Sequence, residues 1–174
     1  MSLEVEIRNR QRRWTVDARR LRAAAVGAMT EEFGLAEAVL GIHLIGERTM
    51  ASMNWAWLRH EGSTDILTFD HRSRKDAPMY GELFVSVDDA VKQASEFGVR
   101  PDVELFRYVI HGILHLLGHR DDEASARRAM KTIENRIVRR WMNRAGVRGL
   151  VGSRAKRGGS RRGANAAVGG RRRP

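Results

Sequence analysis

The residues best able to do chemistry lie in one segment, HGILHLLGHRDD at positions 111–122. On a helix, His111 and His115 are four residues apart, so both imidazoles leave the same face and can reach one ion. Gly118 is a helix-ending residue, after which the chain can turn back toward the two rings. Asp121 lies at the offset of the third ligand in the extended H-E-x-x-H-x-x-G-x-x-H pattern. We therefore predict a metal site of His111, His115 and Asp121, with His119 as the alternative third ligand.

This segment differs from a zinc peptidase at one position. Those enzymes place a glutamate beside the first histidine as general base, and here the residue is Gly112. A metal-bound water would need another proton acceptor, or the bond that is cleaved is not a peptide bond. Because the chain has no cysteine, imidazole and carboxylate groups must hold the metal, and this set favours zinc.

Periodicity places the two histidines on the penultimate helix of an α+β (mixed α/β) domain. Apolar alternation and short apolar runs predict strands over 3–7, 38–46, 64–70 and 82–87, the last two close enough to form a hairpin. Helical spacing with start and stop signals predicts helices over 16–33, 47–58, 87–97, 101–117 and 123–143. The expected fold is one small four-stranded sheet packed with about five helices.

The charge of +11 belongs to the end of the chain rather than to the whole chain. From Arg144 to Pro174 there are ten Lys or Arg residues and no acid, which leaves a nearly neutral body. We predict a folded domain over 1–143 and a disordered, Arg/Gly-rich basic tail over 144–174 that binds RNA phosphates or merely aids solubility. A chain ending at Asn143 is expected to fold and to retain its metal.

The sequence also predicts where the protein works. The first residues lack the apolar stretch of a signal peptide, and no run of about 18 apolar residues could span a bilayer. We expect a cytoplasmic protein with no membrane partner and no nucleotide cofactor.

Three blocks of the sequence resemble the YbeY family of bacterial metal-dependent endoribonucleases. HGILHLLG at 111–118 is close to the family's H-G-x-L-H-L-x-G. MNWAWLRHEGSTDILTF at 53–69 is similar to its block ending T-D-V-L-S-F, and GELFVSVDDA at 81–90 is similar to its G-D-I-x-I-S strand. The resemblance covers about residues 40–140. It implies one zinc ion per chain, cleavage of single-stranded RNA, and action on 16S rRNA of the small ribosomal subunit and in ribosome quality control.

The sequence departs from the family pattern at two positions. The usual third ligand is a histidine ten residues after the first, and here it is Asp121, a carboxylate that can also bind zinc. The family has an arginine six residues before the threonine of T-D-V-L-S-F, where this chain has Leu58, and Arg59 comes one residue later. Arg59 is our candidate catalytic cation for stabilising the charge of the transition state, against the alternative of an ordinary solvated arginine.

Other residues near the predicted site have less specific roles. Thr64, Asp65 and Phe69 are candidates to line the cleft, although a hairpin strand explains them equally well. Glu104 lies seven residues before His111 on the same helical face, and we expect a surface salt bridge there rather than contact with the metal site.

Two other functions compete with that of a zinc-dependent endoribonuclease. One is a non-catalytic ribosome-assembly factor with a structural metal, and the other is a metallopeptidase, which Gly112 opposes. Three protein ligands with an open fourth position would favour an enzyme, whereas a fourth protein ligand such as His119 would favour a structural site.

Overall fold

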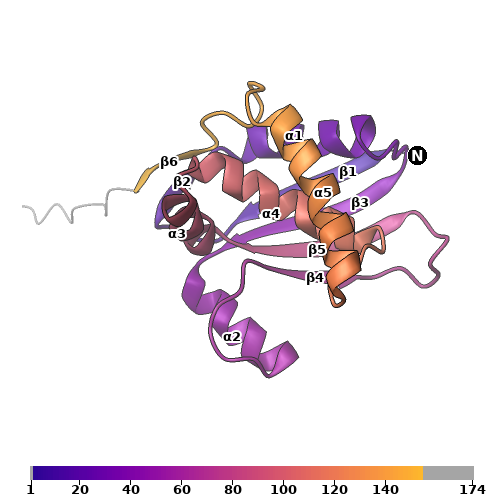
Figure 1. Cartoon of the computed structure of the whole chain (residues 1–174), viewed down its shortest axis with the longest axis horizontal. Helices are drawn as coiled ribbons and strands as arrows, with labels where there is room; N and C mark the ends of the chain where they lie inside the picture. Colours follow the sequence, from indigo (N-terminus) through magenta and orange to yellow (C-terminus); the bar gives the residue numbers. More distant parts are fainter. Residues whose placement is uncertain (1, 155–174) are drawn as a thin grey trace, which may run out of the picture.

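A four-stranded sheet with the strand order β1-β3-β5-β4 forms the centre of the computed structural model, which describes residues 2–154 (Figure 1). β1, β3 and β5 run parallel, and β4 pairs antiparallel with β5 as the predicted hairpin. The four strands are β1 (Leu3–Asn9), β3 (Ala38–Ile45), β4 (Ile66–Asp70) and β5 (Met79–Ser86).

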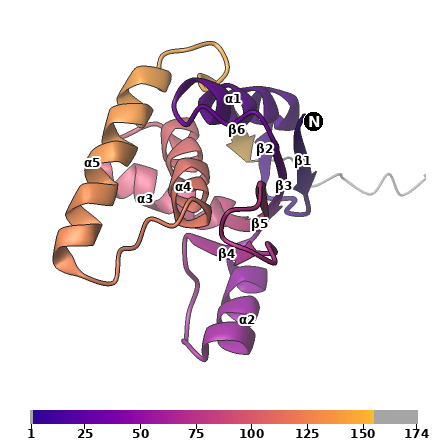
Figure 2. The ribbon, with the colours of Figure 1, turned by 90° about the vertical axis from the view of Figure 1, so that its right-hand side faces the viewer.

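The helices lie on both faces of this sheet. They are α1 (Ala18–Glu31), α2 (Glu47–Leu58), α3 (Val87–Phe97), α4 (Pro101–Leu116) and α5 (Ala124–Trp141). α1 and α4 contact the sheet on one face, and α3 and α5 pack on α4. Figure 2 shows α2 standing apart from these four helices. Its buried Met50 packs with Ile45 and Leu67 in a second, smaller apolar cluster.

The main core lies between α4 and the sheet, and it fixes the position of α4. Along β3 and β5, Leu40, Ile42, Leu83 and Val85 alternate toward this core and are at most 1% exposed. α4 is apolar around most of its circumference and carries twelve buried residues, as expected of a helix enclosed by a sheet, α3 and α5. Pro101 begins it, and Gly118, with a φ of +92°, follows its last turn.

The predicted fold class is confirmed: the described residues form an α+β domain with a four-stranded sheet and five helices, and the two histidines lie on the penultimate helix. Individual boundaries shift by a few residues. β5 begins at Met79 rather than at 82, because residues 79–81 also pair with β3. None of the helices in residues 2–154 combines the length and the apolar character needed to cross a membrane.

The sequence did not predict a second, two-stranded sheet. In it, β2 (Trp14–Val16) pairs antiparallel with β6 (Val151–Arg154). The segment between α5 and β6 buries Val147 and Leu150, which are 0% and 1% exposed. The structured body therefore extends past the expected boundary at 143, because two apolar side chains and a strand pairing hold residues 144–154 against it. The remainder of the expected tail, 155–174, lies outside the described residues.

Candidate metal centre

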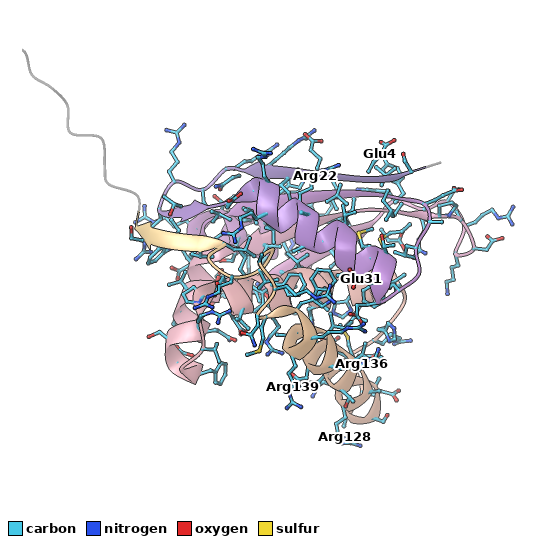
Figure 3. All side chains as sticks on the ribbon, turned by 90° about the horizontal axis from the view of Figure 1, so that it is seen from above. Glu4, Arg22, Glu31, Arg128, Arg136 and Arg139 are labelled. Atoms are coloured by element: carbon cyan, nitrogen blue, oxygen red, sulfur yellow. The ribbon has the colours of Figure 1, made fainter. Side chains whose placement is uncertain are left out.

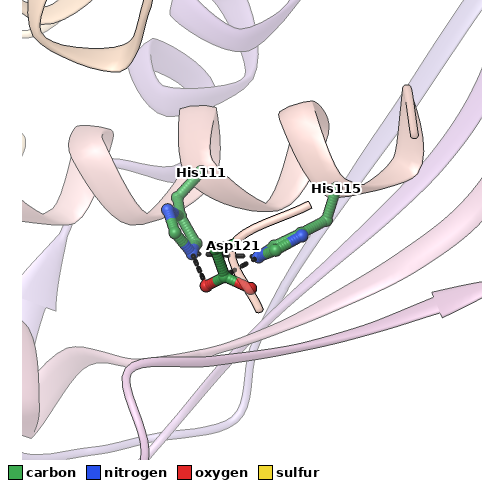
Figure 4. Close-up of side chains that lie close together, drawn as sticks. All are labelled: His111, His115 and Asp121. Atoms are coloured by element: carbon green, nitrogen blue, oxygen red, sulfur yellow. Dashed lines mark hydrogen bonds and ion pairs between the residues drawn. The ribbon is translucent and has the colours of Figure 1, made fainter. Parts of the chain in front are cut away.

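Three predicted ligands come together at the C-terminal end of α4. His111 and His115 lie one helical turn apart, and Asp121 approaches them from the segment between α4 and α5 (Figure 4). The Nε2 atoms of the two histidines are 3.0 Å apart, and Oδ2 of Asp121 lies 4.0 Å and 3.7 Å from those of His111 and His115. Ligand atoms around a tetrahedral zinc ion are about 3.4 Å apart, so this triangle matches the size of such a site.

Hydrogen bonds on the side of each ring away from the site determine which nitrogen carries the proton and which has a free lone pair. Nδ1 of His115 lies 3.1 Å from the backbone carbonyl oxygen of His119, which can only accept, so Nδ1 is the donor. Nδ1 of His111 likewise donates to Glu134, at 2.9 Å. In the neutral rings, both Nε2 lone pairs and the Asp121 carboxylate thus point at one another. Three acceptors at such short range repel one another unless a cation or proton lies between them, so these residues could hold a metal ion.

Glu134 of α5 anchors His111 and belongs to a buried ionic cluster. Its other carboxylate oxygen accepts from Nη1 of Arg107 at 2.7 Å, and Arg107 also pairs with Glu104 at 3.3 Å. The side chains of Glu104 and Glu134 are 5% and 8% exposed. A carboxylate that accepts from the outer nitrogen of a histidine fixes the ring and makes it a better metal ligand.

Electrostatics at this cluster favour the arrangement that metal binding needs. Burial favours the neutral form of Glu134, but hydrogen bonds from His111 and Arg107 hold the pKa of this carboxyl below its usual range. Burial also opposes charge on His111, yet the hydrogen bond and the negative charge of Glu134 raise the pKa of that imidazole. The site therefore attracts positive charge, whether a proton or a metal ion.

The loop that carries Asp121 is held in place from α5. Nε of Arg127 donates to the backbone carbonyl oxygen of Asp121 at 2.9 Å, and the Arg127 guanidinium also reaches the carbonyl oxygen of Asp122. Gly118 lets the chain reverse after α4, because its positive φ is one that residues with a Cβ rarely adopt. Together these contacts bring the carboxylate back toward the two histidines.

Packing in the structure explains why residue 112 is a glycine, which the sequence alone did not reveal. A Cβ at this position would lie 2.4 Å from Cδ1 of Ile66 and 2.8 Å from Cδ2 of Leu83. The helix face beside His111 is therefore pressed against β4 and β5. A glutamate at this position, which supplies the general base in zinc peptidases, would force the side chains of Ile66 and Leu83 to move.

Two cavities meet at the metal centre. One, of about 320 Å³, lies between α4, β4 and the end of α2, and contains His111, His115 and Asp121 in its wall. The other, of about 440 Å³, lies toward α5 and shares His111 and Asp121 with the first. Asp65 lines both cavities, and Thr64 and Phe69 line the first, so all three cleft candidates border the site.

The remaining sequence candidates lie away from the metal centre. The ring of His119 does not join the group of ligand atoms, and this residue contributes its backbone carbonyl oxygen instead. Arg59 is the left-handed cap of α2, and its guanidinium lies 5.9 Å from the ring centre of Trp55. Arg59 is not among the residues that line either cavity. A catalytic role for Arg59 stays a prediction.

The expectation for Glu104 was wrong in one respect. Glu104 does form a salt bridge, with Arg107, but it is buried beside the site rather than exposed on the surface. Burial, which outweighs the nearby arginine, raises the pKa of this carboxyl. Sequence reasoning also missed Glu134, which only the packing of α5 on α4 brings to His111, and Arg107, which lies one turn before His111 on α4 and pairs with Glu134. The one available signal was an acid on the inward-facing side of a strongly amphipathic helix.

Comparison with known proteins shows the family of this chain. A family model described as Endoribonuclease YbeY matches residues 6–142. The chain belongs to this family. The Endoribonuclease YbeY of Anaeromyxobacter dehalogenans (strain 2CP-C) is 37% identical over 142 residues, which cover 81% of this chain and 69% of that protein. The Endoribonuclease YbeY of Thermus thermophilus is 30% identical over 117 residues, covering 66% of this chain and 84% of the relative.

A solved structure supports the fold. The solution structure of TM1509 from Thermotoga maritima matches 82% of this chain and 94% of its own with a TM-score of 0.55, at 22% sequence identity. This similarity shows a shared fold. The family resemblance seen in the three sequence blocks is thus confirmed, and so is the enzyme class, an endoribonuclease.

Proposed function

We propose that this chain is a zinc-dependent endoribonuclease that cleaves single-stranded RNA and acts in 16S rRNA maturation and ribosome quality control. The observation that carries the proposal is the convergence of three acceptor atoms, from His111, His115 and Asp121, within 4.8 Å of one another beside two cavities. The family description supplies the RNA-cleaving activity. Cytoplasmic location and the ribosomal small subunit as partner are part of the same proposal.

The residues around the metal centre have separate tasks in this reaction. A bound zinc ion would supply Lewis acidity toward a phosphodiester oxygen or a water molecule. His111, His115 and Asp121 would hold the ion, with the histidine rings oriented from behind by Glu134 and by the backbone of residue 119. Asp65 lines both cavities and forms no ion pair in the part of the chain that the structure describes, so we assign it the role of proton acceptor.

The competing functions receive less support from the structure. A structural zinc site has four protein ligands, whereas in residues 2–154 only three side chains converge, and the His119 ring is elsewhere. An open fourth position suits catalysis. A metallopeptidase would need a base at the position of Gly112, where any side chain would displace Ile66 and Leu83.

Metal analysis of the purified protein tests the ligand set. His111→Ala and His115→Ala should each remove tightly bound zinc, because two remaining ligands rarely hold the ion. Asp121→Ala should weaken zinc binding much more than His119→Ala, which leaves the backbone carbonyl oxygen in place. Near-stoichiometric zinc in the double histidine variant, or the reverse ranking of Asp121 and His119, would contradict the proposed site.

Cleavage assays test the activity and its biological role separately. The zinc-loaded protein should cut a single-stranded oligoribonucleotide and spare the same sequence in a duplex, and chelation should stop the reaction. In cells depleted of the protein, 16S rRNA with immature ends should accumulate. Expression of the wild-type chain should restore mature ends, and expression of the His111→Ala variant should not. Normal 16S ends on depletion would refute the ribosomal role while leaving the nuclease activity intact.

A further inference from the structure

A large exposed tryptophan stands at the edge of the cavity that contains the metal centre. Trp57, in the last turn of α2, is 66% exposed, yet it lines the same 320 Å³ cavity as His111, His115 and Asp121. Its neighbour Leu58, which is 51% exposed, lines the same cavity, and contiguous exposed apolar side chains commonly mark binding surfaces. Because α2 stands apart from the other helices (Figure 2), much of this ring is open to solvent.

Other aromatic residues pack against the ring of Trp57. Its centre lies 5.3 Å from that of Phe69 in an edge-to-face arrangement, and Phe69 contacts Phe84 in the same way at 5.6 Å. Phe69 and Phe84 pack against the smaller apolar cluster beneath α2. Edge-to-face pairs of this kind stabilise a particular ring orientation. Trp57 is therefore a positioned platform at the mouth of the cleft.

The two sides of the metal centre differ in charge. Within residues 2–154, no lysine or arginine lines the cavity on the α2 side. The cavity on the α5 side is lined by Arg127 and Lys131, and further exposed cations follow along α5, among them Arg128, Arg136 and Arg139 (Figure 3). Among the described residues that line the two cavities, those with phosphate-binding cations lie on the α5 side. On the α2 side, binding energy must come from another kind of contact.

We propose that Trp57 stacks on the nucleobase next to the scissile phosphate and thereby holds the RNA strand in the cleft. This inference rests on the proposed RNA substrate. Every base has a π-face, so an aromatic platform binds single-stranded RNA with little sequence preference. The base must be unpaired to reach the ring, which gives this side of the cleft a preference for single strands. Trp57 is thus a positioning residue for the substrate.

The chain offers a matched control for testing this role. Trp55 lies on the same helix and is 50% exposed, but it contacts Arg59 and does not line the cleft. With a short single-stranded oligoribonucleotide and the zinc-loaded protein, Trp57→Ala should raise KM about 5- to 100-fold. kcat should change little, because stacking is made equally before and during the reaction. Trp57→Phe should restore most of the loss, and Trp55→Ala should behave as wild type.

Substrates with one abasic position identify the base involved. For the wild-type protein, removing the base beside the cleavage site should raise KM by a factor close to that of Trp57→Ala. The variant should show no further loss on this abasic substrate, because the two changes remove one contact. Thermal unfolding of each variant verifies that it is folded, and the exposed position of Trp57 predicts little change.

The outcomes separate this inference from the proposed function. If wild type cleaves the oligoribonucleotide and Trp57→Ala has unchanged KM, the stacking role is overturned while the nuclease assignment stands. Equal losses for Trp55→Ala and Trp57→Ala, or additive losses with the abasic substrate, also overturn it. If wild type cleaves no RNA, both proposals fail together.

Discussion

Replacing Glu134 with glutamine should weaken zinc binding without removing any atom that faces the metal centre. Glu134 accepts a hydrogen bond from Nδ1 of His111 at 2.9 Å, and its side chain is only 8% exposed. Glutamine has the same size and retains a carbonyl oxygen that can accept this bond. The change therefore removes the negative charge behind the histidine while largely preserving the shape of the cluster.

The expected magnitude follows from the surroundings of this carboxylate. Loss of a hydrogen-bonding partner behind a metal ligand typically lowers affinity about 10- to 100-fold, or about 1.4–2.7 kcal/mol. We expect a value toward the upper end, because the carboxylate is buried and little screened by water. Glu134→Ala should in addition destabilise the fold. It should lower the free energy of unfolding by ~1–3 kcal/mol, because the Nδ1–H of His111 loses its partner.

Competition with a chromophoric zinc chelator measures this effect, and Glu104→Gln is the matched control. Glu104 pairs with the same Arg107 but makes no contact with His111. Its substitution removes one charge from the same buried cluster. Because burial raises the pKa of Glu104 whereas hydrogen bonds lower that of Glu134, only Glu134→Gln should lose stability in thermal unfolding. Only Glu134→Gln should lose zinc affinity. Unchanged affinity in Glu134→Gln, or an equal loss in Glu104→Gln, would refute the argument that Glu134 acts through His111.

Four further predictions concern packing, proton transfer and the C-terminal segment. Gly112→Ala should lower the free energy of unfolding by about 1–3 kcal/mol, because the added Cβ would lie 2.4 Å from a side-chain carbon of Ile66. Chemical denaturation measures this loss, and an unchanged midpoint would show that the side chain of Ile66 moves aside without strain. Asp65→Asn should lower kcat about 100-fold or more at unchanged zinc content, and near-normal kcat would exclude Asp65 as the proton acceptor. A chain ending at Arg154 should keep its fold and metal but show a shallower dependence of long-RNA affinity on salt, since seven Lys or Arg residues are removed. A chain ending at Asn143 should be less stable than the full chain, because it also loses two buried apolar side chains. An unchanged salt slope in the chain ending at Arg154 would contradict the first of these two expectations, and an unchanged stability in the chain ending at Asn143 would contradict the second.

The sequence by itself determined the local part of the metal site. The spacing of His111 and His115 places both rings on one helical face whatever surrounds the helix, because helix geometry is a property of the backbone. Gly118 makes the following turn equally local, so the return of Asp121 could be anticipated from its offset. The same local patterns predicted the four strands of the main sheet and the five helices.

Contacts between distant segments were decided only by the tertiary structure. Glu134 reaches His111 because α5 packs on α4, and Trp57 borders the cleft because the end of α2 lies near β4 and the end of α4. Neither position carries a distinctive spacing, since an inward acid and an exposed tryptophan occur on many helices. Pairing of β2 with β6 was equally hidden, because three- and four-residue strands have too few positions to show alternation. Only when Val147 and Leu150 enter the core does that short pairing become favourable, and burial of this kind depends on the whole fold.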